Sequence, residues 1–165
     1  MKNILILTSL TFTINIFSNP CFSSNSDVSD SAYWSSTAIT LLTEKRYEEA
    51  VAVVDLCMKF WSSDAVAKQN EMIKNKTPSP KVGAVTYFEK AAIQKNYLIN
   101  DVSMALWTKA RALHELNLVA PAKIAYAKCI NMSHGRAWDP NGWFWSPSED
   151  CANRAKKLLR HNLAE

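Results

Sequence analysis

The chain has 165 residues, of which 48% are hydrophobic and 21% are charged, a composition typical of one globular domain. It contains only three glycines, too few for the many tight turns of an all-β fold of this size, so a helical protein is expected. The formal net charge of +4 is small and spread along the chain, which argues against nucleic acid as a partner.

Residues 1–23 are predicted to be a signal peptide. Lys2 precedes an apolar run over residues 4–17, which is shorter than the roughly 20 residues that a membrane-spanning helix needs. The small side chains of Cys21 and Ser23 suit a cleavage after Ser23, and a cut a few residues away fits equally well.

Cleavage there makes residues 24–165 a single mature domain, expected to be exported, periplasmic or secreted, with no transmembrane anchor. The competing interpretation is a lipoprotein anchored through Cys21. Pro20 disfavours it, because the residues before Cys21 do not resemble the usual lipidation motif.

The mature chain opens with two helices that form a first helical hairpin, residues 31–61. Asp30 or Ser31 can cap a helix that runs to about Thr43. A second helix begins near Tyr47, with acidic residues in its first turn and apolar residues at helical spacing.

Residues 64–95 predict an irregular middle unit. Residues 64–73 fit a short helix, whereas residues 74–80 are polar, contain two prolines and are expected to form an exposed loop. An amphipathic helix should follow over residues 82–95.

A further helical hairpin is predicted over residues 101–131. Asn100 or Asp101 can cap a helix over residues 102–116, which Asn117 can close. The second helix begins around Pro121, a residue tolerated in a first turn because its missing N–H would be unpaired there.

Residues 132–145 are expected to form an aromatic loop, and residues 147–163 a C-terminal helix. Ser146 is the predicted N-cap, Pro147 suits the first turn, and Glu149 completes a capping box.

Three predicted helices share a pattern of an alanine, a large apolar residue four positions later and a small residue three positions beyond. The sets are Ala50-Val54-Cys57, Ala84-Phe88-Ala91 and Ala122-Tyr126-Cys129. The first two alanines lie 34 residues apart, the period of tetratricopeptide repeats. An alanine at a helix crossing allows the two helices to approach closely.

Residues 30–61 resemble a tetratricopeptide repeat, although Thr37 replaces the usual leucine. The matching residues are Trp34, Ala38, Leu41, Tyr47 and Ala50. The later hairpin fits less well, with Lys109 where an apolar residue is typical. The resemblance implies an all-α fold of antiparallel helical hairpins stacked as a short, irregular tetratricopeptide-like α-solenoid, and an unrelated helical bundle is the alternative.

The C-terminal half carries a second resemblance, to small exported bacterial proteins with tetratricopeptide-like domains and no established function. It rests on Asn100–Val102, Ala110–Leu113 and Arg136–Trp145. A bacterial source is what this resemblance implies.

Cleavage after Ser23 would leave three cysteines, so at most one internal disulfide is expected. The best candidate is Cys129 with Cys151, which lie near helix ends on either side of one loop. Burial of all cysteines as small apolar side chains is an equal alternative. A metal site is not predicted, because the spacing of Cys129, His134, Cys151 and His161 matches no zinc pattern.

Two groups of side chains are candidate partner-binding residues. In tetratricopeptide arrays the first helix of each hairpin lines a concave face, which would present Met104, Trp107, Arg111 and His114 as one stripe. Trp107 could stack on an extended peptide and Arg111 could bind a carboxylate. The alternative is burial of Met104 and Trp107 against the helix predicted over residues 82–95.

The second group is Trp138, Asp139, Trp143 and Trp145 in the aromatic loop. The residues between Trp138 and Trp143 have strong turn chemistry, so the tryptophans should flank a tight reversal. Exposed, they would form a platform for sugar rings or an apolar partner. Buried, they would cap the open end of the helical stack, which is the favoured interpretation.

No phosphate loop, nucleophile elbow, zinc-protease helix or dinucleotide-binding motif occurs in the sequence. We therefore predict no cofactor and no catalytic residues. The expected function is a non-catalytic protein–protein interaction or scaffold module of the cell envelope that binds a protein or peptide. The alternatives are a glycan-binding protein that uses the tryptophan-rich loop and, less favoured, a wall-acting hydrolase.

Overall fold

The structure is a computed structural model that describes residues 19–161. Most of the predicted signal peptide, residues 1–18, and residues 162–165 lie outside the described residues. The described chain is mostly helical, which confirms the predicted all-α character. Its elements are α1 (Asp30–Thr43), α2 (Tyr47–Lys74), α3 (Tyr87–Gln94), α4 (Tyr97–Glu115), α5 (Val119–Asn131), β1 (Ala137–Asp139), β2 (Trp143–Trp145) and α6 (Pro147–His161).

Helices α1 and α2 form the predicted first helical hairpin. The cap of α1 is Ser29, one residue before the expected positions, because its side chain accepts a hydrogen bond from the Ala32 N–H. Trp34 is fully buried, and its Nε1 donates to the carbonyl oxygen of Val53 at 3.0 Å. This bond ties α1 to α2 where the two helices cross.

Helix α2 is continuous over 28 residues, so the predicted break after Trp61 is wrong. No proline or glycine occurs within α2, and nothing in its sequence ends the helix at Trp61. Ala65 and Gln69 are buried, which anchors the second half of the helix. The Gln69 side chain accepts from the His134 N–H at 3.1 Å and donates to the Asn131 carbonyl, so α2 reaches the end of α5.

The hairpin α1–α2 recurs 72 positions later as α4–α5. Corresponding buried residues are Trp34 and Leu106, Ala38 and Ala110, Leu41 and Leu113, Ala50 and Ala122, and Cys57 and Cys129. The inter-helix turns correspond as well, because Lys45 and Asn117 both adopt the left-handed conformation, with φ of 62° and 57°. The two helical hairpins therefore carry buried residues and a left-handed turn at corresponding positions, although α2 has 28 residues and α5 has 13.

The middle copy of the alanine pattern does not pack as a repeat. Ala84 precedes α3, and both Phe88 and Ala91 are exposed. Helix α3 is shorter than predicted, because the Gly83 backbone instead exchanges two hydrogen bonds with Phe144. A capping box between Thr86 and Glu89 then starts the helix.

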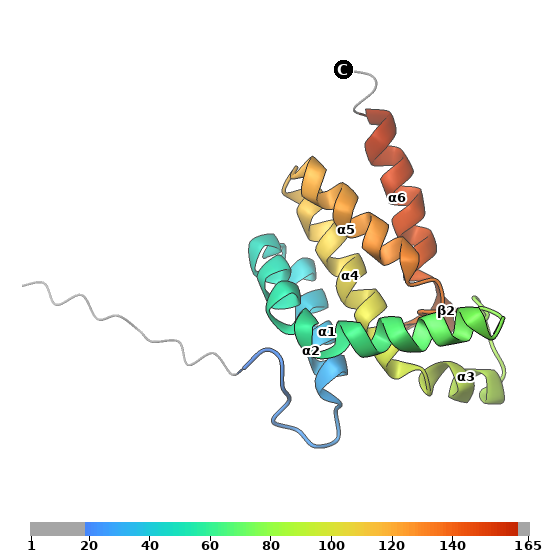
Figure 1. The fold of residues 1–165 in the computed structure, drawn as a ribbon. Helices are drawn as coiled ribbons and strands as arrows, with labels where there is room; N and C mark the ends of the chain where they lie inside the picture. The colour runs from blue at the N-terminus through green and yellow to red at the C-terminus, as the bar shows by residue number, and fades with distance from the viewer. Residues whose placement is uncertain (1–18, 162–165) are drawn as a thin grey trace, which may run out of the picture.

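Helix α4 lies at the centre of the molecule and packs against α1, α2, α5 and α6 (Figure 1). It begins at Tyr97 rather than at the predicted Val102. Asn100, expected to cap it, lies inside the helix. Its side chain donates to the Ile93 carbonyl oxygen and accepts from the Arg136 N–H, both at 2.9 Å.

Two disulfides connect the second helices of the hairpins to flanking segments. Cys129 pairs with Cys151, as predicted, and joins α5 to α6. Cys21 pairs with Cys57 and joins the N-terminal segment to α2. The prediction of at most one disulfide is therefore wrong, and it followed from a cleavage after Ser23 that would remove Cys21. A disulfide-bonded Cys21 also has no thiol left to carry a lipid.

Candidate binding grooves

A long groove runs between α2 and α5 with α4 as its floor; we call it the α2–α5 groove. Its volume is about 800 Å³. Along α2 it extends from Val51 to Ile73, about 33 Å at the helical rise per residue. Apolar side chains dominate its lining, among them Val51, Met58, Val66, Ile73, Leu106 and Ile124.

One ion pair crosses this groove. Lys109 of α4 pairs with Asp55 of α2, and the lysine side chain is mostly buried whereas the carboxylate is half-exposed. Lys109 is the residue that breaks the expected apolar pattern of its hairpin, and the structure gives a reason, because its amino group reaches a carboxylate on α2. The groove thus offers an apolar surface with one charged pair inside it.

Sequence reasoning missed the α2–α5 groove because it ended the second helix at Trp61. Val66 and Ile73 lie beyond that point. The available signal was the spacing of Val51, Met58, Val66 and Ile73, which recurs every seven or eight residues and continues one helix face past Trp61.

A smaller groove of about 440 Å³ lies over α1 and α4 beside the β-hairpin; we call it the hairpin groove. Met104, from the predicted stripe, lines it together with Ile39 and Ser36 of α1. Trp138 and Phe144 of the β-hairpin line it as well.

Asp101 contributes a carboxyl group to the hairpin groove. The Ser31 hydroxyl donates to its Oδ2 at 2.7 Å, which links α1 to α4. Burial raises the pKa of Asp101 to about 6, and the hydrogen bond from Ser31 lowers it by less. This carboxyl therefore carries a proton in mildly acidic solution.

Arg136 is buried at the wall of the hairpin groove without an ion pair to any described carboxylate. Its Nε donates to the Pro80 carbonyl at 2.7 Å, and Nη1 donates to the carbonyls of Ser133 and Gly135 at 3.0 and 2.7 Å. Burial lowers the pKa of this guanidinium. Arg136 thereby fixes the proline-containing loop against the end of α5.

The other residues of the predicted stripe face α6, α5 and β2. Trp107 donates from Nε1 to Asp150 Oδ2 at 2.6 Å, and its ring centroid lies 5.3 Å from that of Trp145. Arg111 sits 5.0 Å above the Trp107 ring. The four stripe residues thus do not share one open face, and Trp107 packs against α6 and β2 instead of the segment that contains α3.

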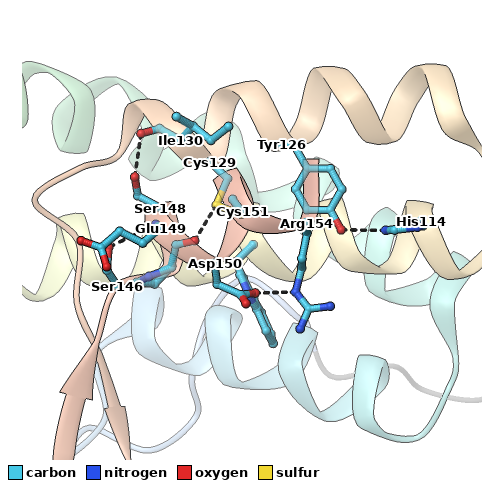
Figure 2. Close-up of a disulfide and its surroundings, with 12 residues drawn as sticks. His114, Tyr126, Cys129, Ile130, Ser146, Ser148, Glu149, Asp150, Cys151 and Arg154 are labelled. Atoms are coloured by element: carbon cyan, nitrogen blue, oxygen red, sulfur yellow. Dashed lines mark hydrogen bonds and ion pairs between the residues drawn. A yellow bond between two sulfur atoms is a disulfide. The ribbon is translucent and has the colours of Figure 1, made fainter. Parts of the chain in front are cut away.

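Helix α6 covers this side of α4 and α5. Three interactions lie close together near the start of α6 (Figure 2). They are the Cys129–Cys151 disulfide, the hydrogen bond from Ser148 Oγ to the Ile130 carbonyl oxygen and the Asp150–Arg154 ion pair. His114 Nδ1 lies 3.0 Å from the Tyr126 hydroxyl on the same side. Burial raises the pKa of Tyr126 to about 12.

The aromatic loop forms a β-hairpin with the predicted tight reversal. Gly142, at φ 105°, donates its N–H to the Asp139 carbonyl at 2.9 Å, and the Asp139 side chain accepts from the Asn141 N–H at 2.8 Å. Asp139 thus stabilises the turn by accepting hydrogen bonds within it.

The tryptophans of the β-hairpin divide between exposed and covered positions. Trp138 stands opposite Phe144 and Asp139 stands opposite Trp143, so the rings of Trp138 and Trp143 lie on opposite faces. Trp138 and Trp143 are both partly exposed, whereas Trp145 is half-buried against Trp107. The hairpin therefore combines a packing role with an exposed aromatic tip.

Among residues 19–161, no group of His, Cys, Asp and Glu side chains is arranged to hold a metal ion. None of the helices in that part of the chain is long and apolar enough to cross a bilayer. Comparison of the chain with protein-family models, with curated proteins and with solved structures finds no match.

Proposed function

We propose that this protein is an exported, non-catalytic binding module that holds an amphipathic helix of a partner protein in the α2–α5 groove. The groove carries the proposal, because it leaves a long apolar surface uncovered between two otherwise well-packed hairpins. Helix-in-groove recognition uses apolar anchors on one helix face, and the 33 Å (about six helical turns) along α2 suits such a ligand. The Asp55–Lys109 pair would fix its register.

We also infer that α1–α2 and α4–α5 are two tetratricopeptide-like units. The 72-residue correspondence of buried residues and of the left-handed turn positions supports this inference. In this arrangement α6 takes the place of the first helix of a further unit. The two disulfides support export, since such bonds persist in oxidising compartments.

Two adjacent serines of α2 provide a matched test. Ser62 lines the α2–α5 groove, whereas Ser63 is exposed and lines neither of the two grooves. A photo-crosslinking amino acid at the exposed groove residue Ile124 should capture the partner in the producing cells. The Ser62→Arg substitution should abolish this adduct by filling the groove, and Ser63→Arg should preserve it. An adduct that survives Ser62→Arg would place the partner elsewhere.

Glycan binding is a second candidate, favoured by the partial exposure of Trp138 and Trp143 at the tip of the β-hairpin. Sugar rings that stack on either indole would change its fluorescence. A titration with cell-wall fragments that leaves the tryptophan emission unchanged would contradict this candidate.

A further inference from the structure

The segments α3, the loop before it and the β-hairpin lie at one end of the molecule (Figure 1), and several of their apolar side chains are exposed. Tyr87 and Phe88 are the most exposed large apolar residues, at 80% and 82%, and Trp138 and Trp143 are 43% and 41% exposed. Val82, at 48%, precedes Tyr87 in the sequence and lines a shallow depression with Trp143, Glu149 and Asp150. We call these five residues the aromatic end.

Contacts between the three segments hold the aromatic end together. The Gly83 backbone pairs with Phe144, Lys81 forms an ion pair with Glu89, and Lys90 Nζ lies 3.9 Å from the centre of the Trp138 ring. Trp138 and Trp143 flank the turn of the β-hairpin on opposite faces, so each presents its partly exposed ring on its own side of the tip. Exposure on this scale at a fixed site marks an interaction surface.

The charge of the same segments is strongly positive. Residues 74–97 and 137–145 contain five lysines, one glutamate and one aspartate. The glutamate is Glu89, which Lys81 and the cap of α3 already engage, and the aspartate is Asp139, which the turn engages. These segments therefore carry most of the net charge of the chain and complement an anionic partner.

We propose that the aromatic end docks on the surface of a lipid bilayer that contains anionic headgroups. Tryptophan and tyrosine favour the interface between headgroups and acyl chains, because each combines an apolar ring with a polar group. Lysines beside such rings are attracted to anionic lipid. The protein binds peripherally, through exposed rings and without a spanning segment among its described residues.

The proposal is tested by co-sedimentation of the processed chain, from which the predicted signal peptide has been removed, with vesicles of phosphatidylcholine alone and of phosphatidylcholine mixed with phosphatidylglycerol. We expect binding to the mixed vesicles, weakened by salt, with a blue shift of tryptophan emission. The double variant Tyr87→Ser/Phe88→Ser should lower the affinity by roughly tenfold or more, because two exposed rings lose their burial in lipid.

The matched control is Leu56→Ser/Leu159→Ser, which removes two side chains that are 53% and 48% exposed on α2 and α6. This control should bind vesicles as the unchanged protein does, and circular dichroism should show both variants folded. Equal binding of the Tyr87→Ser/Phe88→Ser variant, or absence of binding to the mixed vesicles, would overturn the proposal. A dimer that this variant dissociates, with no vesicle binding, would assign the surface to a second copy and overturn it as well.

Discussion

Asp101 is a carboxyl group whose environment opposes its ionisation at neutral pH. Burial raises its pKa from 3.8 to about 6, and its one hydrogen bond from a side chain comes from Ser31. A raised folded-state pKa means that the folded protein binds this proton more tightly than the unfolded chain does. The contribution to stability is therefore fully present below about pH 4 and is lost as the pH rises through about 6.

The Asp101→Asn substitution tests this contribution. The amide can still accept the Ser31 hydrogen bond, and it carries no charge to desolvate. We expect the free energy of unfolding to rise by roughly 1 to 3 kcal/mol at neutral pH and to stay unchanged near pH 4. Urea unfolding at the two pH values measures it, with exposed Asp64→Asn as the control. A variant no more stable than the parent at neutral pH would refute the expectation.

Single-residue predictions succeed where the chemistry is local. Ser146 caps α6 by accepting the Glu149 N–H at 3.3 Å, and the reversal before Trp143 follows from its turn residues. Lys45 shows the limit. Its left-handed backbone ends α1 through a bond from the Arg46 N–H to the Leu41 carbonyl oxygen, and lysine gives no hint of it, whereas Asn117 at the equivalent turn does.

Among the elements, α6 depends most on a covalent bond. The Cys129–Cys151 disulfide is fully buried and closes a loop that contains the whole β-hairpin. Removing both cysteines as Cys129→Ala/Cys151→Ala should lower the free energy of unfolding by about 3 kcal/mol, the loop-closure entropy for 22 residues. Chemical denaturation measures this loss.

Hydrogen exchange distinguishes a local from a global effect of that substitution. Amides of α6 should lose protection more than those of α1, because the bond holds α6 to the α4–α5 hairpin. The matched variant Cys21→Ala/Cys57→Ala should leave α6 protected. Equal loss in α1 and α6 after removal of Cys129 and Cys151 would contradict a local role.

The ends of helices could be predicted where capping residues or prolines mark them. The predictions failed where only packing against other elements determines the end of a helix. Helix α2 has no internal stop signal, and its burial against the end of α5 sets its length. The exposed copy of the alanine pattern at Ala84 and Phe88 shows the opposite error, in which a correct 34-residue spacing occurs without packing. The period of a sequence pattern alone does not show which face of a helix is buried.

For the whole molecule, the structure places Cys21 inside the folded unit, where it is 2% exposed. We therefore expect the processed protein to begin before Cys21 and not at Ser24. Intact mass and N-terminal sequencing of the protein purified from the producing cells, before and after reduction, measure this. Two disulfides should be found; a chain that starts at Ser24 with a free thiol at Cys57 would show the expectation to be wrong.

The arrangement of helices was accessible from sequence only in part. The two hairpins followed from local patterns such as Trp34, Ala38 and Leu41. The position of α6 over Trp107 did not, because it depends on contacts between residues more than 40 positions apart. The covering of Trp107, within the predicted stripe, is a consequence of that long-range packing.

The two disulfides join consecutive cysteines, first Cys21 with Cys57 and then Cys129 with Cys151. Four cysteines allow three ways of pairing, and in this one no other cysteine lies between two partners. In a chain that crosses a membrane N-terminus first, each bond can close in the order in which the thiols emerge. Such a protein can reach its native connectivity without a disulfide isomerase.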